Sequence, residues 1–451
     1  MDFYRFINKN IVNPLYYFKN GDKRLKRLEV LEKNQYLPTP LLDELALENI
    51  KGIVRHAYET TKFYRERLDC LGIKPEDINS LADVVNLPVV TKKDIQENCN
   101  DMISNKFDIS ELIKDASGGS TGEPTIFYRD RESSNNRAAD QIRHDKWSGW
   151  DLGDRFALVW GAKRDLRAAL SFREHIISRY IARIWELDAF EMTEEKMSKY
   201  VNTLEKVQPR MILGYANALA MFSEFLLTKF PEHKIRPRGI ISSAETLTME
   251  NRELIEKAFS CKVLNRYGSR EVGLIASECT EQNGLHLNHD NVYLEVVSNG
   301  APAKVGEVGD ILVTDYSNVG MPLIRYNMGD VGKLSNQVCS CGRTLRLLES
   351  VEGRSGDFFK SKHGTMVHGE YFTHLFYGVE EVEKFQIIQE SLERITLKLV
   401  ASNHDRDSKY IKYITDKTQE ILESKYDFDI VFLEEIPPTA SGKYLFTISR
   451  V

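Results

Sequence analysis

The sequence predicts an α/β protein made of a large N-terminal domain and a small α+β C-terminal domain. The chain has 451 residues, which is too long for one ordinary hydrophobic core. From about residue 116, short apolar runs alternate with helical stretches, the pattern of a layered α/β domain. Near Gly353 the pattern changes to short strands around one helix. We therefore expect a large domain over residues 1–353 and a small domain over residues 354–451.

The elements follow in order along the chain. Residues 40–115 are predicted to be helical, with Thr91 as the N-cap of a helix over Lys92–Cys99. Buried strands are predicted at Phe156–Trp160, Met211–Leu213 and Gly239–Ser242, with helices at Ser198–Val207 and Ala218–Leu227. Leu285–Val297 and Gly309–Thr314 are predicted strands of an antiparallel or barrel-like subdomain. The small domain is predicted to have strands at 383–389, 394–399 and 428–433, a helix at 407–423, and then a loop to the end.

Composition narrows the class of protein. Apolar residues make up 42% and charged residues 28%, the net charge is −6 and the pI is near 6.0, which does not favour a nucleic-acid partner. No apolar run reaches the roughly 18 residues that a membrane span needs, and the N-terminus has no apolar signal-peptide core. Six cysteines without a dense framework fit a reducing, cytoplasmic location.

The N-terminal segment, Met1–Lys33, is both basic and aromatic. We interpret it as a helical arm packed on the body, because basic residues commonly solvate a helix face. Peripheral contact with a membrane surface is the alternative, and a homodimer is equally open. The basic residues are Lys23, Arg24, Lys26 and Arg27, and the aromatic ones are Phe3, Tyr4, Phe6, Tyr16, Tyr17 and Phe18.

A Ser/Gly-rich loop at residues 117–125 could hold phosphates, because glycines let backbone N–H groups turn toward an anion and hydroxyls add donors. It lacks the Gly-Lys-Ser/Thr of a Walker loop. An ordinary turn of the same composition is the alternative.

Two further motifs could contact a nucleotide. Tyr267, on a loop after the probable strand Val263–Leu264, could stack on adenine, and Glu271 could hold Mg²⁺. Asp330, beside a glycine on a predicted tight turn, could accept both ribose hydroxyls. Each motif alone is equally compatible with an ordinary turn.

The fifth feature is Lys443, on a glycine-bearing loop at the extreme C-terminus, where its charge could assist a carboxylate that attacks a phosphate. Taken in order, the Ser/Gly loop, Tyr-Gly-x-x-Glu, Tyr-x-x-Gly-Asp, Gly-Arg-x-x-Asp and Ser-Gly-Lys resemble the adenylate-forming superfamily from about residue 50 onward. That superfamily includes acyl-CoA synthetases, luciferases and nonribosomal-peptide adenylation domains. The stretch Arg143–Gly161 is most similar to the phenylacetate–CoA ligase and CapK-like branch.

The resemblance implies a role for each motif, with a small C-terminal domain that rotates as a lid between two half-reactions. Asp357 would lie at the hinge, and the acid pocket would include Trp160, Gly161, Tyr215 and Asn217. Tyr215 and Trp160 suit an aromatic or compact acid, although a core role fits them equally. The residues implied in catalysis are Lys443, Glu271 and Thr121, and those implied in binding ATP are Ser117, Gly118, Gly119, Ser120, Gly122, Ser243, Ala244, Glu245, Asn265, Tyr267, Gly268, Ser269, Asp330 and Arg354.

Two positions depart from the superfamily pattern. Glu123 stands where many relatives have Lys, which weakens the positive potential beside the phosphates. Met328 replaces a common Thr beside Gly-Asp, which changes a local hydrogen bond.

Four residues could form a metal site, because three thiolates and an imidazole can close a tetrahedral zinc site. Some phenylacetate-ligase-like proteins have a similar pattern. The alternatives are His289 as the imidazole, or unrelated residues with the cysteines buried as small apolar groups. A site closed by four protein ligands would be structural. The candidate ligands are Cys279, His286, Cys339 and Cys341.

The predicted activity is ATP-dependent, AMP-forming activation of a carboxylic acid, followed by acyl transfer to CoA. An amine acceptor, such as an amino sugar in surface-polysaccharide biosynthesis, is the first alternative. A non-catalytic nucleotide-binding scaffold is the second, and the presence of Lys443 and Glu271 argues against it.

Overall fold

The chain forms two compact units. One holds most of the chain up to Val351, and the other holds residues 352–451 together with Gly329–Val331. The computed structural model describes residues 2–117, 125–160, 176–189, 192–354, 358–362, 366–368, 371–372, 375–376, 379, 381–437 and 445–451.

Five parallel strands form one half of the large sheet, in the order β8, β7, β6, β4, β5. Alternate residues point to opposite faces, and both faces are covered, which is why the central strands β4 and β6 are almost entirely apolar. Ile212 and Ile240 face one core, whereas Met211 and Ile241 face another. The predicted strands are confirmed as β4 Phe156–Trp160, β6 Met211–Tyr215 and β7 Gly239–Ser243, joined by β5 Ile184–Asp188 and β8 Lys262–Ser269.

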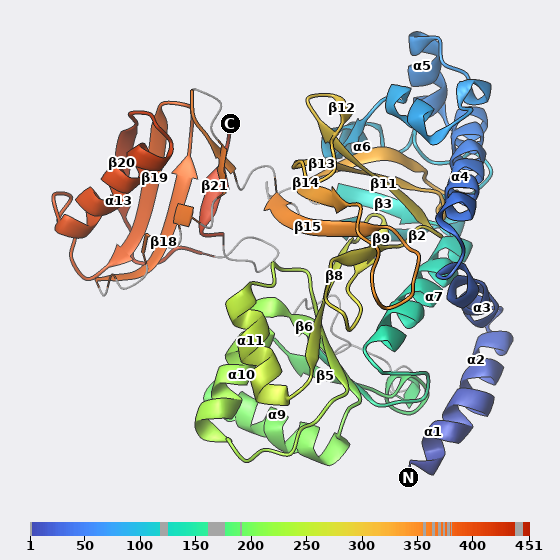
Figure 1. The fold of residues 1–451 in the computed structure, drawn as a ribbon, viewed down its shortest axis with the longest axis horizontal. Helices are drawn as coiled ribbons and strands as arrows, with labels where there is room; N and C mark the ends of the chain where they lie inside the picture. The colour runs from blue at the N-terminus through green and yellow to red at the C-terminus, as the bar shows by residue number, and fades with distance from the viewer. Residues whose placement is uncertain are drawn as a thin grey trace. The chain divides into compact units, whose positions relative to one another are not determined.

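Helices cover both faces of the parallel strands (Figure 1). On one face pack α9 Glu194–Val207, α10 Ala216–Lys229 and α11 Met249–Phe259. On the other face pack α3 Arg24–Asn34 and α7 Arg131–Trp147. The predicted helices at 198–207 and 218–227 are therefore confirmed; the first begins four residues earlier, and the second is longer at both ends.

Antiparallel strands continue the same sheet beyond β8, so the second subdomain is not a separate sheet. The predicted strand Leu285–Val297 is wrong as one element. The polar run from Asn288 to Asn291 makes a turn in which the Asn291 amide bonds to the Asn288 carbonyl at 3.1 Å. The strands are β9 Gly273–Ser277, β10 Leu285–Leu287, β11 Val292–Ser298, β12 Ala301–Pro302, β13 Gly309–Asp315, β14 Leu323–Ser335 and β15 Leu347–Arg354.

The region predicted to be helical, residues 40–115, is mostly helical, but it also contains the short strand Val90–Thr91 and the start of the strand Ile113–Ser117. Thr91 caps α6 Lys92–Asn98 with a reciprocal bond to Asp94, the expected capping arrangement. None of the helices in the described parts of the chain has both the length and the apolar character needed to span a bilayer. The remaining N-terminal elements are α1 Phe3–Ile7, η1 Asn8–Val12, α2 Asn13–Lys19, α4 Thr39–Thr60, α5 Lys62–Leu71, η2 Pro75–Asp77, η3 Leu81–Asn86, β1 Val90–Thr91, η4 Ile109–Glu111, β2 Ile113–Ser117 and β3 Thr125–Arg129.

The C-terminal unit holds a four-stranded sheet in the order β20, β19, β18, β21. Its apolar residues form a core with α13 Lys409–Ile421. The predicted loop to the end of the chain is wrong, because β21 Thr447–Ser449 pairs in parallel with Ile387–Gln389. The other strands are β16 Phe358–Lys360, β17 Met366–His368, β18 Val382–Gln389, β19 Arg394–Ala401 and β20 Asp427–Phe432.

Candidate active site and cysteine–histidine cluster

Three predicted site residues lie at the carboxyl ends of neighbouring parallel strands. Trp160 ends β4, Tyr215 ends β6 and Ser243 ends β7. Tyr215 is paired with Ser243, and Ser243 with Arg266 of β8. The carboxyl edge of an open parallel sheet is where such folds bind ligands.

The aromatic pair at this edge is in direct contact. The ring centroids of Trp160 and Tyr215 are 4.1 Å apart at an angle of 30°. Both residues remain partly exposed, so the pair offers aromatic surface at the strand ends. This arrangement could hold an apolar or aromatic group.

The residues after β7 are held by the start of α10. The Glu245 carboxylate accepts the backbone N–H of Asn217 at 2.9 Å, and Asn251 donates to the Asn217 side chain at 3.2 Å. Ala244, which lies between Ser243 and Glu245, has a left-handed φ of 68°. This conformation costs a non-glycine residue energy and is often found at functional sites. Glu245 thus caps a helix, a role that the sequence did not indicate.

Tyr267 lies inside β8 and not on a loop after it, so that part of the prediction is wrong. The strand continues because β9 pairs with it beyond Val263 and Leu264. At Gly268 a side chain is excluded, since a Cβ there would lie 2.6 Å from the carbonyl oxygen of Gly273. The close approach explains the glycine after the tyrosine.

Asn265 is fixed through its backbone. Its N–H donates to the Glu278 carboxylate at 2.7 Å. Arg252 in turn binds that carboxylate through both oxygens, at 2.9 and 3.0 Å. This bidentate pair locks β8 against α11 just before Tyr267.

Glu271 lies on the turn between β8 and β9 and is buried. Arg137 of α7 holds this turn by donating to the backbone carbonyls of Arg270 at 3.1 Å and Glu271 at 2.6 Å. The same guanidinium pairs with buried Asp315 at 2.8 Å. These hydrogen bonds hold the Glu271 backbone against α7.

A group of arginines that the sequence analysis missed lies beside this turn. Arg129 pairs with Asp115 at 2.8 Å across the β2–β3 hairpin, and Arg270 approaches the same carboxylate at 3.7 Å. Burial, and then the nearby charges of Arg137 and Arg270, lower the pKa of Arg129. The signal in the sequence was the basic residue inside Tyr-Gly-Ser-Arg-Glu.

The hairpin also sets the ends of the predicted phosphate loop. Ser117 and Thr125 are cross-strand partners, so the seven residues between them begin and end at one point of the hairpin. Both side chains are buried, and among the described residues neither hydroxyl has a hydrogen-bond partner. Two such hydroxyls could serve an anion held by the loop.

Asp330 lies within β14 and not on a tight turn, so this prediction is also wrong. The strand is paired through Tyr326 and Asn327 with β1, a partner that sequence patterns did not suggest. Gly329 nevertheless has a left-handed φ of 82°, which interrupts regular strand geometry next to Asp330. Arg354 is the last residue of β15, and its side chain is outside the described set.

Several predicted site residues lie outside the described residues. They are Gly118, Gly119, Ser120, Thr121, Gly122 and Glu123 of the loop, Gly161 of the acid pocket, Asp357 of the hinge, and Lys443. Their roles stay predictions.

The predicted metal ligands do come together. One ligand atom from each of Cys279, His286, Cys339 and Cys341 lies within 4.8 Å of the others. The Cys279 and Cys339 sulfurs are 3.6 Å apart, and Cys341 Sγ is 3.4 Å from His286 Nε2. Zinc–sulfur bonds of about 2.3 Å in a tetrahedron place two sulfurs about 3.8 Å apart, so the spacing fits zinc.

The chemistry of these donors also fits a metal. Burial, and then Arg343, lower the pKa of His286 to about 4, which keeps the imidazole neutral. Burial raises the pKa of the Cys341 thiol, but hydrogen bonds from Arg343 and Cys339 and the charge of Arg343 together lower it by more, so the balance is downward. The alternative imidazole, His289, instead accepts the Arg346 N–H at 3.3 Å.

Gln35 links this cluster to the N-terminal helices. Its side-chain oxygen accepts the indole N–H of Trp147 at 3.1 Å and the Arg343 Nε–H at 3.0 Å. The Trp147 ring also contacts the edge of His286, with centroids 5.4 Å apart. The cluster therefore joins the end of α3, the end of α7 and the segment before β15.

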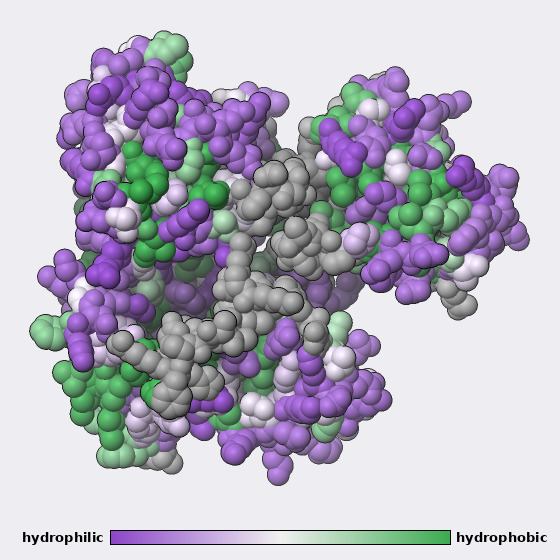
Figure 2. All heavy atoms as spheres, turned by 180° about the vertical axis from the view of Figure 1, so that it is seen from behind, coloured by the Kyte–Doolittle hydropathy of each residue, from purple (hydrophilic) through white to green (hydrophobic). Residues whose placement is uncertain are grey.

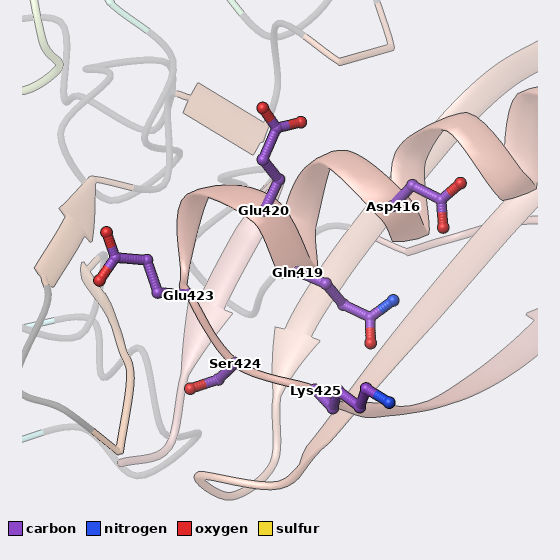
Figure 3. A pocket seen from close by; sticks show the side chains of 6 residues that line it. All are labelled: Asp416, Gln419, Glu420, Glu423, Ser424 and Lys425. Atoms are coloured by element: carbon purple, nitrogen blue, oxygen red, sulfur yellow. The ribbon is translucent and has the colours of Figure 1, made fainter.

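A shallow hollow on the C-terminal unit lies near the end of α13 (Figure 3). Asp416, Glu420 and Glu423 line it, but their carboxylates point apart (Figure 3). Glu420 also pairs with Lys417 at 2.6 Å. Diverging carboxylates do not form a cation site, so we assign no function to this hollow.

Comparison with known proteins finds relatives in the branch that the sequence resembles. Residues 359–450 match the family model of the CapK C-terminal domain. Protein CapK of Staphylococcus aureus is 26% identical over 414 residues, which cover 91% of this chain and 90% of that protein. The phenylacetate-coenzyme A ligase of Escherichia coli K12 is 26% identical over 329 residues, covering 70% and 72%.

Solved structures share the fold. A 2-hydroxyisobutyryl-CoA ligase, solved in the postadenylation state with an acyl-AMP, superimposes with a TM-score of 0.67 at 20% identity, covering 93% of this chain and 91% of that chain. ATP-bound MatB from Rhodopseudomonas palustris gives a TM-score of 0.51 at 14% identity, covering 76% and 68%. The fold is that of the adenylate-forming CoA ligases, and the predicted α/β class is confirmed.

Proposed function

We propose that this protein activates a carboxylic acid with ATP and transfers the acyl group to CoA. The observation that carries the proposal is the set of side chains at the carboxyl edge of β4, β6 and β7, next to the β8–β9 turn that holds Glu271. This edge binds ligands in open α/β sheets. The similarity to phenylacetate-CoA ligases over 70% of the chain supports the same activity.

In the first half-reaction, a carboxylate oxygen of the acid attacks the α-phosphorus of ATP. The bond from that phosphorus to the bridging oxygen breaks, and pyrophosphate leaves. In the second, the CoA thiolate attacks the acyl carbon and AMP leaves. Such chemistry depends mainly on positioning and on neutralising negative charge. The acid supplies the nucleophile, so no catalytic serine is required.

Individual residues are proposed to act as follows. Tyr267 stacks on adenine, and Asp330 accepts the ribose hydroxyls. Glu271 holds Mg²⁺ beside the phosphates, and Lys443 stabilises the charge that develops during adenylation. The unpartnered hydroxyls of Ser117 and Thr125 support anion binding by the loop between them.

Arg129, Arg137 and Arg270 are proposed to supply the positive potential that Glu123 weakens. Arg129 and Arg270 are linked through Asp115, which lies with Arg129 on the hairpin that carries the loop, and Arg137 is linked to Arg270 through the β8–β9 turn. Asp115 and Asp315 offset two of the three charges, and the third lies beside Glu271 and the hairpin.

An amine is the second candidate acceptor. This alternative follows from the CapK-like resemblance: Protein CapK matches 91% of the chain, whereas the phenylacetate-coenzyme A ligase, whose name gives CoA as the acceptor, matches 70%. The C-terminal unit also matches a CapK domain model. An amino sugar is the amine that we propose for this alternative.

The cysteine–histidine cluster is proposed to hold a structural zinc ion. Four protein ligands leave no open position for substrate or water. Metal analysis of protein purified without chelators is expected to give about one zinc per chain. A content near zero would reject the site.

The decisive experiment measures ATP–pyrophosphate exchange across a panel of carboxylic acids. We expect at least one acid to support exchange, and an aromatic or compact acid to support it best. Addition of CoA or of an amino sugar should then release AMP and form the corresponding thioester or amide. A panel in which no acid supports exchange would contradict the proposed activation.

A further inference from the structure

In the N-terminal arm, residues 3–19, large apolar side chains face outward and two asparagine side chains face the protein body. Five large apolar side chains are exposed, at 73% for Phe3, 64% for Phe6, 50% for Ile11, 62% for Leu15 and 85% for Phe18. A helix that packs on a protein body normally turns such residues inward. The exposed set therefore needs a different explanation from packing on the body.

Two asparagines hold the arm on its inner side. Asn8 is fully buried and donates to the carbonyls of Tyr180 and Ile181 at 2.9 and 3.0 Å. Asn13 is 2% exposed and donates to the Asn8 side-chain oxygen at 2.7 Å. Main-chain partners fix the rotation of the arm, so its apolar face is held outward.

A π-turn aligns the apolar face. The stretch from Phe3 to Lys19 stays helical through η1, where both Asn8 and Asn13 have right-handed helical backbone angles. A regular helix turns about 100° per residue and would spread the five side chains over about 180°. One extra residue in a π-turn shifts the second half back by about 100°, which brings all five within about 80°.

The amino acid after this turn explains why it forms. Pro14 has no N–H to donate to the carbonyl four residues before it, and its ring would clash there. A wider turn immediately before the proline relieves that clash. The local sequence therefore builds the single apolar face.

Charge is segregated toward the same end of the chain. Residues 1–30 hold seven Lys or Arg and three Asp or Glu, a net charge of +4, whereas the whole chain carries −6, which leaves −10 on the other residues. Arg5 and Arg24 are paired with Asp154 and Asp22, at 2.5 and 2.6 Å. Lys19, Lys23 and Lys26 are exposed and extend the basic character along the arm and α3.

Figure 2 shows a cluster of apolar side chains protruding at the lower left, the position that α1 and α2 of Figure 1 take in this reversed view. We propose that this face inserts into the interface of an anionic lipid bilayer. Exposed aromatic and aliphatic side chains beside lysines are the features of helices that lie in that interface. A second copy of the chain fits less well, because a twofold contact would place two positively charged arms against each other.

Vesicle co-sedimentation tests the proposal without any acid, ATP or CoA. The full-length protein should bind vesicles of phosphatidylglycerol and phosphatidylcholine, and bind vesicles of phosphatidylcholine alone at least about fivefold more weakly. Replacing Phe3, Phe6 and Phe18 together by Ser should abolish binding. Lys19→Glu, Lys23→Glu and Lys26→Glu together should reduce binding to the anionic vesicles by about tenfold or more.

Matched controls remove exposed residues elsewhere. Met249→Ser with Val338→Ser removes two side chains exposed at 67% and 82%, and should leave vesicle binding unchanged. Lys106→Glu, Lys257→Glu and Lys304→Glu make the same change in net charge on the body. Together they should reduce binding less than the triple substitution of Lys19, Lys23 and Lys26 does.

Two outcomes would overturn the inference. One is wild-type protein that sediments equally poorly with both kinds of vesicle. The other is a dimer in light scattering that the Phe→Ser variant dissociates, which would identify a second copy as the partner. Since arm residues take no part in the proposed chemistry, pyrophosphate exchange should be the same in all the variants, and its failure would concern only the proposed function.

Discussion

Asp140 carries a carboxyl group that is almost completely buried, and its pKa is raised to about 6. Burial is the main cause, partly offset by Arg143 and by the Asn288 amide, which donates at 2.8 Å. The pKa of this carboxyl in the unfolded chain is about 3.9. Between about pH 4 and pH 6, the folded state therefore holds a proton that the unfolded state has lost. The cost of burying the charge is absent below this window and fully present above it.

Asp140→Asn should therefore gain stability relative to wild type as the pH rises. Inside the window, the difference in unfolding free energy grows by about 1.4 kcal/mol per pH unit. Above the window, the difference stays constant. Urea unfolding at several pH values measures it. A difference between the two proteins that stays constant from pH 4 to pH 7 would show that Asp140 titrates normally.

Arg270 offers a test of the proposed phosphate potential. Arg270→Leu should raise the KM for ATP about two- to tenfold, the effect of one charge at about 10 Å. The kcat should change less, and Arg270→Lys should restore most of the affinity. An exposed control, Arg406→Leu, should leave both constants unchanged. A fall in kcat alone would contradict a role in binding.

At the scale of elements, Gln35 connects α3 to the cysteine–histidine cluster. Gln35→Ala leaves the buried Trp147 N–H without its acceptor, which should cost about 1–3 kcal/mol. Differential scanning calorimetry should show a lower Tm, and a chelator should then remove zinc faster than from wild type. Gln337→Ala, at an exposed glutamine on the connection between β14 and β15 that carries Cys339 and Cys341, is the matched control. A variant that melts and loses metal like wild type would contradict the link.

The elements also show what the sequence could predict. Strands β4, β6 and β7 were predictable because both faces are covered, so each contains a short apolar run. Tyr267 and Asp330 were expected on turns because each adjoins a glycine. Tyr267 stays in a strand because it pairs with Ala276 of the following strand β9, and β14, which holds Asp330, pairs through Tyr326 and Asn327 with the distant strand β1, a pairing that only the fold determines.

The candidate site was predictable in its residues and less so in their contacts. The metal ligands were found because cysteine and histidine are distinctive donors. The arginines around Asp115 come from β3, α7 and the β8–β9 turn, and no spacing in the sequence relates these three places. Electrostatic groups assembled by tertiary structure are not visible as motifs.

At the scale of the whole molecule, two compact units carry different proposed roles. Lys443→Ala should reduce pyrophosphate exchange by at least about a hundredfold, because it removes charge stabilisation from adenylation. The same variant should still transfer an acyl group from a chemically supplied acyl-adenylate to CoA. Lys425→Ala, on the same unit, controls for loss of surface charge. Equal loss in both half-reactions would contradict a role confined to adenylation.

The opposite charges of the arm and the body have a kinetic consequence. Near an anionic bilayer, residues 1–30 with their net charge of +4 would be attracted while the remaining residues, with −10, would be repelled, so the molecule would experience a torque before it makes contact. This orientation acts only within the Debye length, about 8 Å at physiological ionic strength. Added salt should slow association far more than it speeds dissociation, because the inserted aromatic side chains hold the bound state by apolar contact.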